Sequence, residues 1–255
     1  MALTPTFYIR EKGKAWHHSL DDYKWAVEDL INVGEPELEE HNIQIPFGKE
    51  YNLSSTMFGF PFFTTRDLSF SIGVPLNNLS GLTPNNSWNE YTSNLRNLYE
   101  GKEVEIILSD DMEWYYEGTA HITDFEASRK LGTFKLNVHC SAYKQNMTET
   151  ITQVEAQSTT TEQIEVQLPD SPYPAEVSMY FSQASGSQTF RSQTYLEWKI
   201  NGKTYSHTFP VNSSLTGETL PLLFSRSDNY GVSGTLKLRG EWDSDIIFLI
   251  RKRSL

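Results

Sequence analysis

Two adjacent aspartates, Asp110 and Asp111, precede an aromatic run from Trp114 to Tyr116, and their residue types suit hydrolysis or metal binding. Glycoside hydrolysis requires two carboxyl groups that face one bond, and metal sites require clustered oxygen ligands. Neighbouring side chains on a tight turn seldom converge on one point, whereas aspartate favours turns because it bonds nearby backbone amides. We therefore interpret both aspartates as turn residues. The aromatics fit strand packing, with Trp114 and Tyr116 on one face and Tyr115 on the other.

The histidines and the single cysteine suit no catalytic or metal site. None of the histidines has the spacing that places two ligands on one helical face; they are His17, His18, His41, His121, His139 and His207. Cys140 lies in a strand-like run, so its neighbour His139 would face the other way. We expect Cys140 to be a buried small side chain. Phosphate-binding loops and a Gly-x-Ser-x-Gly elbow are absent, and the sequence predicts no cofactor and no catalytic residue.

Four residues of the C-terminal half could together bind a carbohydrate: Trp198, His207, Asn212 and Trp242. Aromatic rings can cover the apolar faces of sugars, while amide and imidazole groups bond hydroxyls. The alternative is that both tryptophans belong to a core. We favour the core interpretation because Trp198 alternates in phase with Leu196 and Ile200.

One helix is predicted, over residues 87–99. Its apolar residues recur at the spacing of a single helical face, namely Trp88, Tyr91, Leu95, Leu98 and Tyr99. Ser87 and Glu90 have the spacing of a capping box, and Gly101 stands where a helix C-terminus favours a left-handed residue.

Two strands are predicted directly after this helix. Residues 103–108 alternate, with Val104, Ile106 and Leu108 on one side. The other face, which carries Glu103, Glu105 and Ile107, is expected to be wetter. The second strand runs from residue 114 to about residue 122. The predicted unit is therefore a helix, a strand, a turn and a strand.

The composition predicts a mainly β protein of two domains. Thirteen tyrosines, 14 phenylalanines and six tryptophans, with scattered Gly and Pro, are typical of short half-buried strands. A Thr-, Gln- and Ser-rich stretch places a boundary at residue 146. Beyond it, residues 195–209 read as a hairpin with an Asn201-Gly202 turn. Further strands are expected at residues 164–168, 176–181, 235–239 and 246–250, as in a sandwich or jelly roll.

The charge and hydropathy exclude several classes of partner. The net charge is −12, from 21 Lys and Arg against 33 Asp and Glu, which argues against a phosphate-binding surface. Most of the acidic excess lies in residues 1–146, including the acidic run of residues 27–41, which we interpret as a solvated loop. No signal-peptide core and no membrane-spanning run is present, so we expect a protein made and kept in a cytoplasm.

Several motifs, in this order, resemble the distal tail proteins of long-tailed phages that infect Gram-positive bacteria. They are Gly13-Lys14 with "SLDDYKW", then "IQIPFGKEYNLS", then "FFTTRDLSFSI" with Arg66, then the run from Trp88 to Gly118, and finally "AYKQN" at residues 142–146. The match from Trp88 to Gly118 is the strongest of these. Beyond residue 146 the similarity is limited to domain order and β pattern.

The resemblance implies a structural, non-enzymatic phage protein of two domains. Residues 1–146 would be a ring-forming β-barrel or sandwich with one helix, and residues 147–255 a galectin-like β-sandwich (jelly roll). The resemblance further implies a homo-hexameric hub in the virion that joins the major tail tube protein to the tail-associated tip protein and to receptor-binding baseplate proteins. DNA would pass through the ring without specific binding, and an acidic lumen would repel it and prevent adhesion. A carbohydrate-binding module acting on the bacterial wall is the alternative function.

Overall fold

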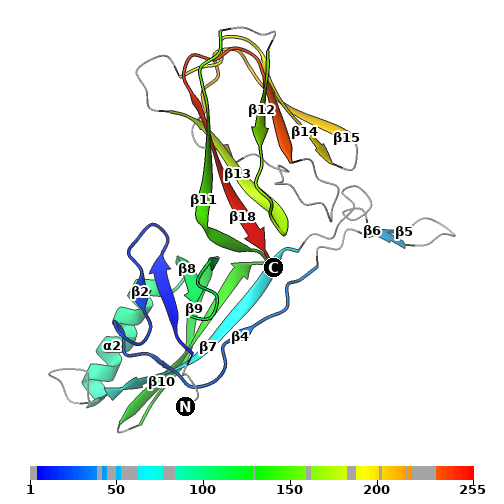
Figure 1. Ribbon diagram of the computed structural model, residues 1–255. Coiled ribbons are helices and arrows are strands. Elements are labelled where there is room, and N and C mark those ends of the chain that lie inside the picture. Colours follow the sequence, from blue (N-terminus) through cyan, green and yellow to red (C-terminus); the bar gives the residue numbers. More distant parts are fainter. Residues whose placement is uncertain are drawn as a thin grey trace. The chain divides into compact units, whose positions relative to one another are not determined.

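The protein divides into two compact units, each described by itself below (Figure 1). The computed structural model describes residues 5–38, 42–44, 50–52, 63–76, 84–128, 130–158, 162–182, 188–200, 203–215, 218–219 and 234–255. Unit 1 comprises Met1–Leu38 and Phe63–Gln145, and unit 2 comprises Glu39–Phe62 and Asn146–Leu255. The expected boundary at residue 146 did not anticipate that the segment from Glu39 to Phe62 would group with unit 2.

Unit 1 is an antiparallel sheet with a single helix among its described residues. The pairing order is β2-β1-β8-β9-β10-β7, and the short strands β3 and β4 pair with β7. The bounds are β1 Phe7–Glu11, β2 His17–His18, β3 Ala26–Val27, β4 Asn32–Val33, β7 Thr65–Pro75, β8 Glu103–Leu108, β9 Trp114–Ala127 and β10 Leu131–Ser141. The prediction of a mainly β chain with one helix is confirmed.

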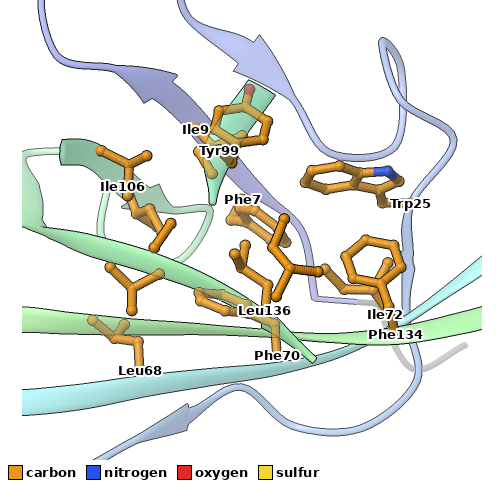
Figure 2. Packing of buried hydrophobic residues seen from close by; sticks show 14 of the residues in the cluster. Phe7, Ile9, Trp25, Leu68, Phe70, Ile72, Tyr99, Ile106, Phe134 and Leu136 are labelled. Carbon is orange, nitrogen blue, oxygen red and sulfur yellow. The ribbon is translucent and has the colours of Figure 1, made fainter. Parts of the chain in front are cut away.

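Alternating apolar residues build the core of unit 1. In β7 the side chains of Leu68, Phe70 and Ile72 are fully buried, while the residues between them are polar. Strands β1 and β7 are separated by three strands in the pairing order, yet the rings of Phe7 and Phe70 lie 4.4 Å apart. The sheet therefore curls around its own core, which Figure 2 shows filled by aromatic and aliphatic side chains.

The helix α2 spans Pro84–Tyr99 and packs on the sheet. It begins three residues before the predicted start at Ser87, so the predicted capping box is wrong, because Ser87 lies inside the helix. Proline suits the first turn of a helix, where its missing N–H has no intrahelical acceptor. Gly101 follows the helix with φ 69°, as expected of a left-handed C-terminal residue. Leu98, expected on the apolar face, is 39% exposed.

Most of the expected wetter face of β8 is buried. Glu103 at the start of the strand is exposed, but Glu105 and Ile107 are each only 5% exposed, so the prediction is wrong for these two residues. The reason is the neighbouring strand β1, where Arg10 lies opposite Glu105 and donates to its carboxylate. An ion pair across two strands lets an alternating strand bury a polar residue.

Unit 2 is an antiparallel β-sandwich. One sheet has the order β12-β17-β14-β15, and β16, β13, β18 and β11 follow one another in the other. The bounds are β5 Asn42–Gln44, β6 Glu50–Asn52, β11 Lys144–Val154, β12 Gln163–Gln167, β13 Tyr173–Phe181, β14 Thr194–Ile200, β15 Lys203–Phe209, β16 Glu218–Thr219, β17 Thr235–Arg239 and β18 Ile246–Ser254. Strands β5 and β6 form a separate two-stranded pair, and the chain passes from unit 1 to unit 2 within β11.

Both sheets contribute to the core of unit 2. Leu196 and Leu238 come from the four-stranded sheet, and Met179 and Phe248 from the other, and all four are fully buried. The predicted hairpin is confirmed, with Trp198 opposite Tyr205; its predicted turn, Asn201-Gly202, lies outside the described residues. Among the residues described, no helix combines the length and the apolar character needed to cross a bilayer.

Candidate functional site

The aspartate pair turns the chain between β8 and β9. The backbone N–H of Asp111 donates to Leu108 O at 3.0 Å, and Asp111 O accepts from Trp114 N–H at 3.2 Å. The Asp111 carboxylate lies 2.7 Å from Lys144 Nζ, whereas Asp110 is exposed. One carboxylate therefore holds a lysine while the other faces solvent, and the pair does not converge on one point. The interpretation as turn residues is confirmed.

The aromatic residues after this turn pack as predicted. Tyr116 joins the core of unit 1, and Trp114 is half-buried. Tyr115 is buried on the opposite face, where its hydroxyl donates to Gln145 Oε1 at 3.0 Å. None of the three rings belongs to an open aromatic platform.

The histidines of unit 1 make pairwise contacts with carboxylates. His18 Nδ1 lies 3.0 Å from Asp21 Oδ2, and His139 Nδ1 lies 2.8 Å from Asp67 Oδ1. His41 lies outside the described residues. Across the ranges that the structure describes, no group of three or more His, Cys, Asp or Glu side chains is arranged to hold a metal ion.

The four candidate carbohydrate residues do not form one platform. Trp242 is 1% exposed, and its Nε1–H donates to Glu155 O at 2.9 Å, so the core interpretation holds for this residue. Trp198 is half-buried against the core of unit 2. His207 is exposed in β15, and Asn212 is exposed in the following turn with φ 61°. The burial of Trp242 leaves its ring faces unavailable to a ligand.

A shallow groove of about 350 Å³ nevertheless lies on the four-stranded sheet of unit 2. Trp198 and seven polar residues line it, among them Glu165, Glu197 and Lys237. These three charged residues stand opposite one another on β12, β14 and β17, and Lys237 Nζ lies 3.2 Å from Glu165 Oε1. The groove thus offers both hydrogen-bond donors and acceptors.

Cys140 and Arg66 face each other across β10 and β7 in the interior of unit 1. Cys140 is 1% exposed, which confirms the prediction of a buried side chain, and burial raises the pKa of its thiol to about 12. Arg66 is 6% exposed. Arg66 was not among the predicted candidate site residues. Its position in β7 nevertheless indicates a buried cation, because it lies on the same face as Leu68, Phe70 and Ile72.

Searches against protein-family models and against curated proteins found no match. The fold, however, matches that of solved structures. One of these is the Dit protein (gp 19.1) of phage SPP1, described as a paradigm of the hub adsorption apparatus in phages that infect Gram-positive bacteria. The two structures agree with a TM-score of 0.52 over 98% of this chain and 99% of that chain, at 14% sequence identity. The resemblance read from the sequence motifs is confirmed for the fold.

Proposed function

We propose that this protein is a structural component of a phage tail, the hub at its distal end. In this proposal six copies form a ring that joins the major tail tube protein to the tail-associated tip protein and to the receptor-binding baseplate proteins. The assembled protein belongs to the virion and is built in the cytoplasm of the bacterial host. The observation that carries the proposal is a shared fold that extends over nearly the whole of both chains.

The roles of the candidate chemical groups also favour a non-enzymatic protein. Asp111 is bonded to Lys144, and Cys140 is a buried thiol whose pKa is raised to about 12 by burial. His139 is paired with Asp67. Asp111 and His139 are engaged in contacts with other side chains, and Cys140 is buried. These are the roles expected of such residues in a structural protein.

The two domains have different tasks in this proposal. Residues 1–146 would form the ring, and residues 147–255 would form a galectin-like sandwich. Copies that associate head to tail form a ring when the rotation from one copy to the next returns to the starting copy. A ring suits a protein that surrounds a DNA channel. The excess of acidic residues would keep DNA from adhering to the channel.

Native mass spectrometry of the full chain, alone and with the tube and tip proteins, tests the assembly. A hexamer is the expected species, and electron microscopy of the same sample should reveal a ring with an open centre. A chain that stays monomeric at every concentration and with both partners present would refute the ring. A strongly basic channel would refute the proposed role of the acidic residues while leaving the ring intact.

Carbohydrate binding is the second candidate function, and the groove beside Trp198 favours it. Its mixture of donors and acceptors suits a hydroxyl-rich ligand such as a wall polysaccharide. Trp198→Ala should abolish binding on a glycan array, while the buried Trp242 should be essential for folding and not for recognition. Binding that Trp198→Ala leaves unchanged, with the fold preserved, would rule out this site.

A further inference from the structure

Arg66 is a buried cation at a position of β7 that faces the core of unit 1. It is 6% exposed and stands in phase with the core residues Leu68 and Phe70 of β7. Its buried Nε has no hydrogen-bond partner, and none of the ion pairs among the described residues includes Arg66. A buried guanidinium is normally paired, because transferring an isolated charge from water into the protein interior is costly.

The polar groups next to Arg66 carry no compensating charge. Its Cζ lies 5.8 Å from the centre of the Tyr116 ring, near the limit of a cation–π contact. Burial raises the pKa of the Tyr116 hydroxyl, and it raises the pKa of the Cys140 thiol to about 12, although Arg66 acts in the opposite direction on both. Both groups are therefore neutral at physiological pH and cannot balance the guanidinium.

The carboxylates that act electrostatically on Tyr116 and Cys140 lie close to side chains other than Arg66. Asp67 lies 2.8 Å from His139, Asp111 lies 2.7 Å from Lys144, and Glu117 is bonded to Lys12. Each of these contacts is made to a group other than Arg66. In the described part of unit 1, Arg66 therefore forms no ion pair with a carboxylate.

We propose that Arg66 forms an ion pair with a carboxylate from a neighbouring copy of this chain. This contact rests on the ring assembly proposed above. The chain itself has a surplus of carboxylates that could accept from the guanidinium, with 33 acidic residues against 21 basic ones. Exposed carboxylates without an ion-pair partner among the described residues include Asp29, Glu35, Asp110 and Glu113. The small exposed fraction of Arg66 admits a single side chain from outside and little more.

The contact predicts opposite effects of one substitution on the free and the assembled chain. Removing an uncompensated buried charge should leave the dilute single chain as stable as the wild type, or more stable. In the assembly the same change would leave the neighbour's carboxylate buried and unpaired, which weakens association. If Arg66 only stabilised the fold of the single chain, its substitution would lower the stability of that chain directly.

The test compares Arg66→Met and Arg66→Lys with the wild type in the full chain. Dissociation of the assembly is measured by native mass spectrometry and sedimentation, and the melting temperature at concentrations below assembly. Arg66→Met should weaken assembly by at least about tenfold without lowering the melting temperature, and Arg66→Lys should recover part of the loss. Arg96→Met is the matched control, because Arg96 also lies over an aromatic ring, 4.7 Å from that of Phe125, but is exposed.

Three results would overturn the inference. If wild type and Arg66→Met assemble equally well, Arg66 does not pair across the interface, and the ring proposal survives. If Arg66→Met lowers the melting temperature of the dilute chain or prevents folding, the counter-charge lies within the chain. If the wild type never assembles, the ring proposal fails, and the pairing of Arg66 between copies fails with it.

Discussion

Trp88 of α2 packs directly onto Gly132 of β10. A Cβ atom at position 132 would come within 2.3 Å of the Trp88 ring, closer than any ordinary contact. Trp88 is 7% exposed and belongs to the core of unit 1, so the ring has little room to move aside. A residue without a side chain in the strand is what allows the helix to approach the sheet this closely.

Gly132→Ala should therefore destabilise unit 1 by about 1–3 kcal/mol through overpacking. Denaturant unfolding measures the effect. The double variant with Trp88→Ala is the control, since the smaller side chain leaves space for the new methyl group. In that background Gly132→Ala should cost much less, and equal costs in both backgrounds would show that the two residues do not compete for space.

The hydroxyl of Tyr91 should make stability fall at high pH. It accepts from Trp25 Nε1–H at 2.5 Å, and burial raises its pKa from the ordinary value of about 10 to about 12. The unfolded chain loses this proton at a lower pH than the folded chain. The stabilisation by the protonated Tyr91 hydroxyl is therefore complete below about pH 10 and is lost as the pH rises towards about 12. The loss in the free energy of unfolding is on the order of 2 kcal/mol. Unfolding measured across that range should be less pH-dependent in Tyr91→Phe; an identical dependence would contradict the assignment.

The two adjacent aspartates should differ in their effect on stability. Asp111→Asn should cost about 1 kcal/mol, because the ion pair with Lys144 is only partly exposed, with 34% and 15% of the two side chains accessible. Asp110→Asn should change the free energy of unfolding by less than about 0.5 kcal/mol. Equal costs at both positions would contradict the different roles assigned to them.

Cys140 should be inert in the folded protein. Its thiol is buried and its pKa is raised to about 12, so the reactive thiolate is scarce and inaccessible. Alkylation of the native chain should be at least about a hundredfold slower than alkylation in denaturant. Cys140→Ala identifies any reaction at other residues. Comparable native and denatured rates would show that the thiol is accessible.

The sequence by itself determined the helix, the two strands after it and the main strands of unit 2, and its motifs contain no obvious reaction centre. Alternation of apolar residues predicted β8, β9, β17 and the β14–β15 hairpin, because the pleat of a strand places every second side chain on the same face. The adjacent aspartates were correctly read as turn residues for a similarly local reason. The order of such local motifs also carried the resemblance to a distal tail fold.

Only the tertiary structure decided which polar residues are buried and which partners they meet. Glu105 looked solvent-facing in its own strand, and its burial depends on Arg10, which lies 95 residues away along the chain. The contact of Trp88 with Gly132 and the burial of Arg66 likewise depend on contacts between distant segments. Local periodicity reports on one element at a time, whereas burial and pairing are set by the elements that pack against it.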